Sequence, residues 1–365
     1  MSKILFLVNH DVGIYNFRLE VIQRIIKDGH RVIISSPYGE RIDDLINEGC
    51  EYKEIKLARH GMNPIKECFL IATYLKLIRD MKPDVVLSYT IKPNVYGGIA
   101  CSLTRTPYIA NITGLGTAIE NGGLIQKFLC ILYKIALRKA HRIFFQNEEN
   151  ERFFANQNIS KEKHFLIPGS GVNLERYSPL DYPNDIEPIK FLMIARIMKD
   201  KGIDEYLSAA ETIKNKYPNT EFHICGFCEP EYENEMEEIK KKGTVIYHGM
   251  VEDVREVLKD MHCTVLPSYH EGMANVLLES ASSSRPVIAT NIPGCRETFD
   301  DGITGFGCEA KSAQSLMDAI EKFLALTHKE KIQMGVAGRA KMEKCFDRQI
   351  VVEAYIKEIN TILNK

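Results

Sequence analysis

Short apolar runs alternate along the chain with longer segments whose apolar residues recur at helical spacing. The run Lys3 to Val8 predicts a buried strand, and Asn16 to Asp28 and Pro64 to Met81 predict helices. Strands that alternate with helices in this way are typical of a parallel sheet covered on both faces. We therefore predict an α/β fold. Its first half is expected to hold strands at Lys3 to Val8, Arg31 to Ser35, Asp84 to Ser88, Tyr108 to Asn111, Arg142 to Phe145 and His164 to Ile167.

The alternation stops once and then starts again. Three prolines fall within residues 177–188, a composition typical of a linker. We therefore predict Rossmann-like domains over residues 1–176 and 189–345, with parallel sheets facing a central cleft, and a C-terminal helix over residues 346–365 that packs toward the first domain. Ligands of such sheets bind outside the carboxyl ends of the strands. In the second domain, strands are expected at Ile189 to Ala195, Glu221 to Gly226, Val245 to His248, Thr264 to Pro267 and Pro286 to Ala289.

Length, charge and hydropathy agree with this interpretation. A chain of 365 residues is long enough for two domains, each with its own core. The net charge of -2 gives no sign of nucleic-acid binding. The N-terminal apolar run ends at Asn9 without a cleavage site of small residues, and no stretch approaches the roughly 20 apolar residues that span a bilayer. We expect a cytoplasmic protein.

The ten cysteines are irregularly spaced, which predicts reduced thiols rather than a disulfide framework. Cys225 and Cys228 form the one C-x-x-C pair that we considered for redox or metal chemistry. No second pair supplies the remaining ligands of a structural zinc site. We interpret the pair as a turn at the end of a strand.

Two glutamates separated by seven residues occupy a segment that passes from a strand through a loop into a helix. Residues 264–267 predict the strand, Gly272 marks the turn, and Asn275 opens the helix. Glu271 is then expected at the strand's carboxyl edge and Glu279 about one turn into the helix, so that both carboxylates face one cleft. The free N–H groups of the helix start suit an anion such as a diphosphate. The alternative is that both glutamates are solvated surface charges.

A second polar cluster follows the first strand of the second domain. Arg196 and Lys201 come directly after the apolar run that ends at Ala195, ahead of a helix expected over residues 204–217. Arginine can grip phosphate oxygens through two donors, and lysine adds a point charge. We expect both cations to project into the cleft that the glutamates face, and we assign Lys199 to a solvated turn.

Together these motifs resemble the nucleotide-sugar signature of the retaining glycosyltransferases of family 4, which have the GT-B fold. Residues 171–179 are similar to the segment that leads into the second domain in this family, and residues 293–307 to the loop after its glutamate helix. The likeness covers nearly the whole chain. The residues that carry the signature are Arg196, Lys201, Gly202, Leu266, Pro267, Ser268, Glu271, Gly272 and Glu279.

The resemblance implies a role for each polar residue. Glu279 should hold the ribose hydroxyls, Glu271 the hydroxyls of the transferred sugar, and Arg196 with Lys201 the diphosphate. Fixed cations favour the departing diphosphate, which makes Arg196 and Lys201 expected catalytic residues. Glu271 is the third, through its hold on the transferred sugar. No metal or cofactor is expected, since the chain lacks an Asp-x-Asp motif, and the resemblance points to a uridine diphosphate donor. The full donor site is expected to comprise Gly13, Arg196, Lys201, Glu271, Gly272, Met273, Ala274, Asn275, Val276 and Glu279.

The first half resembles the subset that builds bacterial capsule, O-antigen and glycoprotein oligosaccharides on a polyprenyl diphosphate. The similar segments are residues 92–94 and 113–116. The implied reaction moves a hexose or N-acetylhexosamine to that lipid-linked acceptor at the inner face of the cell membrane. Many members place a histidine after the strand that here ends at Asn111, and this chain has none there. The acceptor-side candidates are His10, Lys92 and Thr113.

Alternatives remain open for the function and for the acceptor side. A nucleotide-sugar epimerase would share the architecture but should carry its own acid and base in the cleft, and the sequence reveals none. A non-catalytic nucleotide-sugar-binding protein would need the donor site alone. For His10, a role as a helix cap or packing residue is as well supported as a place beside the reacting sugar.

Residues 124–141 mix lysine and arginine with leucine, isoleucine and phenylalanine. This mixture is expected of a helix that lies on an anionic membrane surface. The sequence therefore predicts peripheral membrane contact here, with a core-packed helix that has a charged outer face as the alternative.

Overall fold

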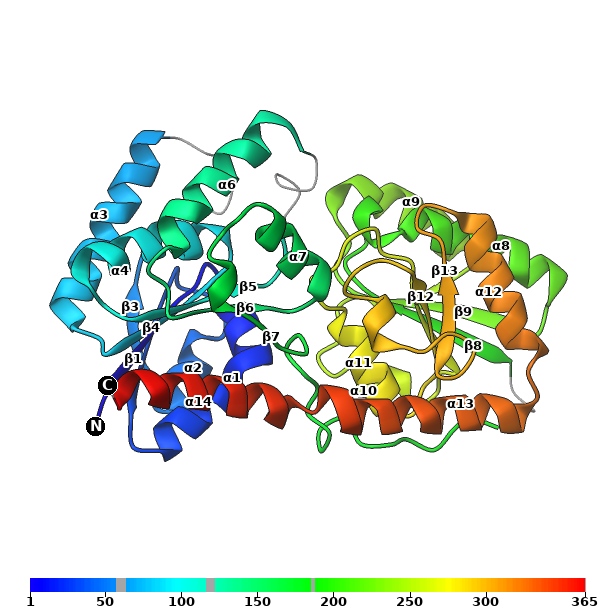
Figure 1. Cartoon of the computed structure of the whole chain (residues 1–365). Helices are drawn as coiled ribbons and strands as arrows, with labels where there is room; N and C mark the ends of the chain where they lie inside the picture. The colour runs from blue at the N-terminus through cyan, green and yellow to red at the C-terminus, as the bar shows by residue number, and fades with distance from the viewer. Residues whose placement is uncertain (57–63, 116–121, 185–187, 365) are drawn as a thin grey trace. The chain divides into compact units, whose positions relative to one another are not determined.

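The computed structural model describes residues 1–56, 64–115, 122–184 and 188–364 (Figure 1). The chain divides into two compact units, each with its own sheet. The first unit comprises residues 1–170 together with residues 349–365, and the second comprises residues 171–348. Both sheets are parallel and flanked by helices, which confirms the predicted α/β class with two Rossmann-like domains.

The sheet of the first unit has seven parallel strands in the order β3-β2-β1-β4-β5-β6-β7. The strand order reverses between β1 and β4, where doubly wound sheets place their ligands. Side chains of β1 alternate between the two faces: Leu5 and Leu7 belong to one core, and Ile4 and Phe6 to the other. The strands are β1 (Lys3–Leu7), β2 (Arg31–Ser36), β3 (Glu51–Glu54), β4 (Val85–Tyr89), β5 (Tyr108–Ile112), β6 (Arg142–Phe145) and β7 (His164–Leu166).

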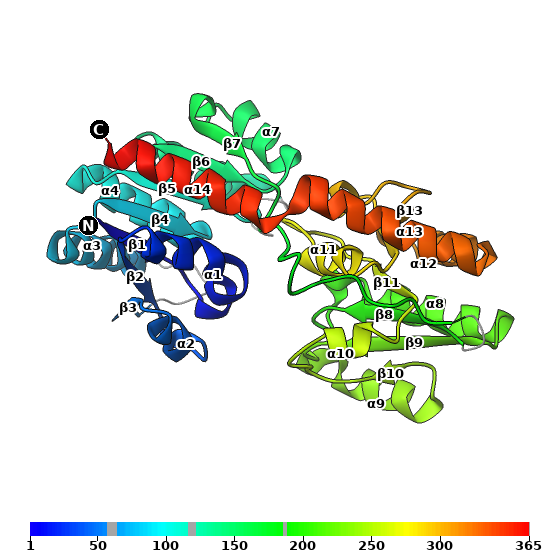
Figure 2. The ribbon, with the colours of Figure 1, turned by 90° about the horizontal axis from the view of Figure 1, so that it is seen from below.

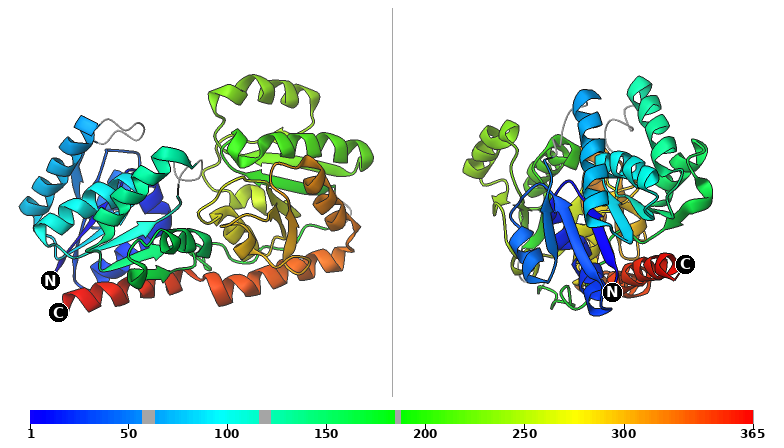
Figure 3. Two further views of the ribbon diagram at one scale, coloured as in Figure 1. Left: turned by 45° about the horizontal axis from the view of Figure 1, so that its top comes forward. Right: turned by 90° about the vertical axis from the view of Figure 1, so that its left-hand side faces the viewer.

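Helices cover both faces of this sheet. One face carries α3 (Pro64–Met81), a π-helical turn (Pro93–Gly97), α4 (Gly98–Thr104), α6 (Gly123–Leu137) and α7 (Glu148–Asn156), and Figure 3 shows α3, α4 and α6 beside one another. The other face carries α1 (Asp11–Lys27), α2 (Ile42–Asn47) and α14 (Arg348–Leu363). A short 3₁₀ turn (Lys161–Lys163) precedes β7.

Figure 2 shows α14 lying along the strands of the first sheet. A buried polar network fastens the helix there. The Arg18 Nε donates to the Tyr355 hydroxyl at 3.1 Å, and that hydroxyl donates to the Asn111 Oδ1. Asn111 in turn donates to the Ser88 carbonyl at 3.1 Å. The C-terminal helix is therefore part of the first unit, although it is far in sequence from the other residues of that unit.

The sheet of the second unit repeats the topology with six parallel strands in the order β10-β9-β8-β11-β12-β13. Its reversal point lies between β8 and β11. The strands are β8 (Ile189–Ile194), β9 (Thr220–Cys225), β10 (Ile246–Tyr247), β11 (Cys263–Leu266), β12 (Val287–Thr290) and β13 (Gly305–Cys308). The helices are α8 (Ile203–Lys216), α9 (Glu233–Lys242), α10 (Arg255–Leu258), α11 (Asn275–Ser282), α12 (Ala313–Ala325) and α13 (His328–Lys341).

The division between the units differs from the predicted linker. The break falls at residue 170 rather than 176, and described residues of 177–188 pack into the second unit. Tyr177 is buried there, and Arg285 donates to the carbonyls of Leu180 (3.1 Å) and Asp181 (2.7 Å). The prolines therefore mark an ordered segment laid along the second unit. Residues 185–187 lie outside the described part of the chain.

Candidate functional site

Two polar segments meet at the reversal point of the second sheet. Arg196 and Lys201 follow β8, and Ser268 to Glu271 follow β11, which is the neighbour of β8 in the sheet. Carboxyl ends of adjacent parallel strands lie at the same edge, so the two segments are brought together although about 70 residues separate them.

Lys201 and Glu271 form a close ion pair. The Lys201 Nζ lies 2.5 Å from the Glu271 Oε1, and the two side chains are 20% and 15% exposed. The Ser268 hydroxyl donates to the same oxygen at 2.9 Å. The predicted juxtaposition of this cation with this carboxylate is therefore present, and the Ser268 hydroxyl helps to hold the pair at the sheet edge.

A glycine makes this approach possible. Gly202, directly after Lys201, has φ +73, and a Cβ there would lie 2.1 Å from the Pro267 carbonyl oxygen of the β11 segment. Only a residue without a side chain lets the two strand ends come this close.

Gly202→Ala is expected to lower the free energy of unfolding by about 1–3 kcal/mol, because alanine adds both strain at positive φ and a backbone clash. Thermal unfolding measures the change. The matched control is Gly13→Ala in α1, where a Cβ meets no atom within 4 Å and φ is not positive. Equal melting temperatures for both variants would show that Gly202 carries no such constraint.

The start of α11 is held beside Glu271 by a second close approach. Gly294 has φ +82, and a Cβ there would lie 2.6 Å from the Glu271 carbonyl oxygen; its own carbonyl accepts from the Ala274 N–H at 2.8 Å. Ala274 is the N-cap of α11, and no side chain caps the helix. The Asn275 Oδ1 is buried and has no hydrogen-bond partner among the described residues. The first turn of α11 therefore offers N–H groups and one acceptor atom to a ligand.

Met273 contributes to this segment through its backbone. Its side chain is buried in an apolar cluster with Tyr177, Leu278 and Met342. Val276 and Gly272 are partly buried. Since the Met273 and Ala274 side chains are buried, these two predicted donor residues can contact a ligand only through their backbone.

Glu279 lies one turn further along α11 in a different environment. The Tyr177 hydroxyl hydrogen-bonds to its carboxylate, and Arg348 and Arg176 lie close enough to act on its charge. Burial nevertheless raises the pKa of the Glu279 carboxyl to about 7, and the hydrogen bond from Tyr177 and the two arginines only partly offset it. Within the described residues no hydrogen bond joins Glu279 to Glu271, so each carboxylate has its own partners.

Arg196 has an ion-pair partner that the sequence did not suggest. Its guanidinium is 60% exposed and pairs with Glu229 at 3.3 Å, so its place on the diphosphate stays a prediction. Glu229 follows β9, the outer neighbour of β8, and this position draws the side chain away from β11. Glu229 had not been singled out from the sequence.

The candidates of the first unit lie at the ends of its strands. His10 is the N-cap of α1, with its Nδ1 accepting from the Val12 N–H at 3.2 Å, so its capping role is confirmed. Gly13 lies exposed in the first turn of α1, in the first unit, whereas the other donor candidates lie in the second. Lys92 pairs with Glu67 at 2.8 Å, and both side chains are nearly buried. Thr113 is partly buried just after β5, and Gly116 lies outside the described residues.

Sequence reasoning missed Tyr177 and Arg348 as partners of Glu279. Tyr177 had been counted only within residues 171–179, the segment that resembles the family's entry into the second domain, and its hydroxyl was the available signal. Arg348 lies 69 residues beyond Glu279, and nothing local in the sequence connects the two.

The described residues contain no group of three or more metal-ligating side chains, so metal independence stays a prediction. All ten cysteines are free. Between Cys225 and Cys228, Gly226 packs against the end of β8, where a Cβ would lie 1.9 Å from the Ala195 carbonyl oxygen. The C-x-x-C pair thus forms the turn at the end of β9.

Comparison with known proteins relates both units to glycosyltransferases. Residues 3–147 match the family model "Glycosyl transferase 4-like", and residues 181–341 match "Glycosyl transferases group 1". The chain is 27% identical, over 99% of both chains, to the N,N'-diacetylbacillosaminyl-diphospho-undecaprenol alpha-1,3-N-acetylgalactosaminyltransferase of Campylobacter jejuni. It is 28% identical to the capsular polysaccharide biosynthesis glycosyltransferase CapM of Staphylococcus aureus, over 87% of this chain and 89% of that one.

The fold is also similar to that of a solved structure. Anabaena HepE in complex with UDP matches with a TM-score of 0.82 at 16% identity, over 98% of this chain and 100% of that one. The match extends over both units and supports the same two-domain architecture.

Proposed function

The chain belongs to the group 1 glycosyl transferases and has the GT-B fold, and from this premise we propose that it moves a hexose or N-acetylhexosamine from a nucleotide diphosphate sugar to a polyprenyl-diphosphate-linked saccharide. The donor nucleotide is proposed to be uridine diphosphate, since the similar HepE structure holds UDP. The lipid-linked acceptor is supported by the Campylobacter jejuni relative, whose name describes transfer to a diphospho-undecaprenol-linked sugar. The observation that carries the proposal is the Lys201–Glu271 pair beside the uncapped start of α11.

The chemistry follows from the charges at this sheet edge. The Lys201 ammonium and the N–H groups of α11 would hold the diphosphate, and Arg196 would join them by leaving Glu229. Glu271 would accept hydrogen bonds from sugar hydroxyls, and the Asn275 Oδ1 offers a further acceptor. Charge builds on the diphosphate as the anomeric C–O bond breaks, and cations fixed there favour the transition state over the bound donor.

The proposed stereochemical course is retention without a protein nucleophile or a metal ion. The acceptor hydroxyl attacks from the face that the diphosphate leaves and passes its proton to the departing phosphate oxygen. Glu279, in the second turn of α11, would bind the ribose hydroxyls. His10, Lys92 and Thr113 remain the proposed acceptor-side residues. The capping bond of His10 and the Lys92–Glu67 ion pair, which hold two of these side chains, are compatible with the proposal.

We extend the proposal to membrane contact through α6. No described helix is both long and apolar enough to cross a bilayer. Leu124, Phe128 and Ile131 of α6 are nevertheless 83%, 52% and 56% exposed. A helix that only packed against the core would bury such large apolar side chains, whereas a helix at a membrane surface presents them to the lipid. Sedimentation of the intact protein with anionic vesicles at low ionic strength tests the contact, and a protein that stays in the supernatant would contradict it.

Incubation with radiolabelled UDP-sugars and a polyprenyl-diphosphate-linked saccharide tests the activity. We expect transfer of label to the lipid fraction with one sugar of the panel, and release of UDP in equal amount. Isomerised sugar nucleotide would instead favour the epimerase, and tight donor binding without turnover would favour a nucleotide-sugar-binding protein. Retention is read from the anomeric coupling constant of the product.

A further inference from the structure

The outer surface of α6 carries an apolar stripe that is exposed among the described residues of the first unit. Leu124, Phe128, Ile131 and Ile135 follow one another at steps of four, three and four residues and are all at least half exposed. They lie on the side of the helix opposite Tyr133, which is buried against the sheet. A helix with one apolar side in the core and another in solvent has a second apolar surface to cover.

Basic residues border this stripe without acidic partners. Residues 122–141 contain no aspartate or glutamate, whereas Lys127, Lys134, Arg138 and Lys139 are all exposed. Within the described part of the chain, no carboxylate forms an ion pair with these four side chains, although other surface cations of the same unit, such as Arg24 and Arg31, are paired. The stripe is therefore bordered by cations that no described carboxylate neutralises through an ion pair.

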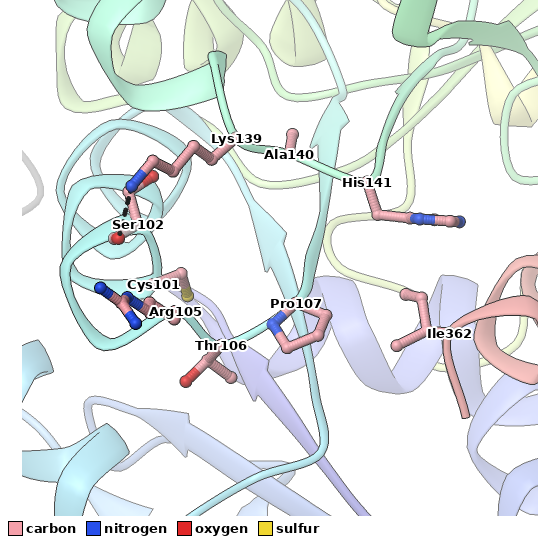
Figure 4. Close-up of a pocket in the computed structure, with 9 residues that line it drawn as sticks. All are labelled: Cys101, Ser102, Arg105, Thr106, Pro107, Lys139, Ala140, His141 and Ile362. Carbon is pink, nitrogen blue, oxygen red and sulfur yellow. Dashed lines mark hydrogen bonds between the residues drawn. The ribbon is translucent and has the colours of Figure 1, made fainter. Parts of the chain in front are cut away.

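A groove opens at the C-terminal end of the stripe, between α4 and α6. It consists of two adjoining hollows of about 450 and 500 Å³ that share Ser102 and Lys139. Figure 4 shows the Lys139 amine and the Arg105 guanidinium on the same side of the first hollow, with Ser102 between them. Lys139 donates to the Ser102 carbonyl at 3.3 Å, while Arg105 ends α4 at φ 59 with its side chain exposed.

The opposite wall of the groove is largely apolar. Pro107, Ala140 and Ile362 line it, and the lining residues of both hollows include no carboxylate. Cations on one wall and apolar atoms on the other match a phosphodiester with attached hydrocarbon better than a sugar or an inorganic ion.

The groove is separate from the proposed transfer site. Pro107 directly precedes β5 and His141 directly precedes β6, so the groove lies at the amino-terminal edge of the first sheet. The acceptor-side candidates Lys92 and Thr113 follow β4 and β5 at the carboxyl edge of the same sheet. A ligand in the groove would therefore act as an anchor and not as a substrate.

We propose that the groove between α4 and α6 binds the phosphate headgroup of an anionic membrane phospholipid. Arg105 and Lys139 would contact the phosphate, and the apolar stripe of α6 would insert where the headgroups meet the acyl chains. This inference deepens the proposed membrane contact and does not depend on the sugar chemistry. It predicts a saturable headgroup site in addition to the general attraction of basic residues to anionic bilayers.

The first experiment measures binding of the intact protein to vesicles of phosphatidylcholine with and without phosphatidylglycerol. Arg105→Gln/Lys139→Gln is expected to weaken binding to the anionic vesicles about 25-fold, because each basic side chain near such a surface contributes about a fivefold factor. The matched control is Lys240→Gln/Lys241→Gln in α9, which removes two exposed lysines from the second unit. Equal losses of vesicle binding in the two variants would show that the groove contributes only non-specific charge, and would overturn the proposal.

The second experiment separates a lipid site from a free-phosphate site. Monomeric dihexanoyl-phosphatidylglycerol should saturate the wild type and not the Arg105→Gln/Lys139→Gln variant, as read by chemical-shift changes or calorimetry. Equal binding of inorganic phosphate at the same concentration would overturn the lipid assignment. Transfer to a short-chain, water-soluble acceptor is expected to be unchanged in the Arg105→Gln/Lys139→Gln variant. Loss of anchoring is therefore distinguishable from failure of the proposed activity. A parallel loss of this transfer would place the groove in the reaction and contradict its anchoring role.

Discussion

Lys201→Ala is expected to lower kcat for sugar transfer by about 10²–10³, the usual effect of removing one preorganised electrostatic contact to a developing charge. The Lys201 ammonium is held 2.5 Å from Glu271 and only 20% exposed, so it requires little reorganisation when the diphosphate begins to leave. Because this contact strengthens in the transition state, kcat should fall more than KM rises. Steady-state kinetics with varied UDP-sugar measure both constants.

The neighbouring Lys199 supplies the control for this variant. It lies in the same 3₁₀ turn, is exposed, and was assigned from the sequence to solvent. Lys199→Ala should leave kcat within about twofold of the wild type, since removal of a solvent-exposed surface charge changes little. A wild-type kcat in Lys201→Ala, with Lys199→Ala unchanged as well, would refute the site assignment.

The structure predicts a larger contribution to kcat from Lys201 than from Arg196, although the sequence predicts the same role for both. Arg196 must leave Glu229 and order an exposed side chain before it reaches the diphosphate, and both steps reduce its net contribution. We therefore expect Arg196→Ala to raise the donor KM more than it lowers kcat.

Most of the fold could be predicted because the strands that form the centre of each sheet are continuous apolar runs. The strands that escaped prediction are edge strands with other compositions. β3 reads Glu-Tyr-Lys-Glu and is partly solvated, and β13 reads Gly-Phe-Gly-Cys, where Gly305 is required because a Cβ would lie 2.2 Å from the Val287 carbonyl oxygen. Helix α1 begins five residues before its predicted start because the cap is the His10 side chain. Local periodicity contains no information about such contacts.

The candidate site was predictable where the topology alone brings residues together. Lys201 and Glu271 follow adjacent strands, so strand order places them side by side. The partners of Arg196 and Glu279 depend on side-chain packing across the second unit, and sequence spacing does not encode it. Tyr177 and Arg348 reach Glu279 from segments 102 residues before it and 69 residues after it.

Glu279 predicts a pH dependence of donor binding. Its pKa is raised to about 7 by burial, and only the ionised carboxylate accepts hydrogen bonds from both ribose hydroxyls. The donor KM should therefore rise about tenfold from pH 8 to pH 6, as the ionised fraction falls by that factor, while kcat stays nearly constant. Tyr177→Phe removes a hydrogen bond that favours the charged form, so its inflection should move to higher pH. A donor KM that is flat between pH 6 and pH 8 would contradict this assignment.

The ionised Glu279 carboxylate should lower the free energy of unfolding in the same pH range, above about 7, in which it binds the donor best. Its folded pKa lies above the unfolded value, so folding favours the protonated form, and this contribution to stability is lost as pH rises through about 7. Glu279→Gln keeps the shape without the charge; we expect a higher melting temperature than the wild type at pH 8, with the difference vanishing near pH 5, and weaker UDP binding at pH 8. Glu256→Gln, at an exposed carboxylate of the same unit, is the control and should alter neither property appreciably. A Glu279→Gln variant that is destabilised at pH 8 would show that the charge is fully compensated by Tyr177 and the two arginines. Loss of UDP binding together with a gain in stability would instead identify Glu279 as a residue kept for its ligand at the expense of the fold.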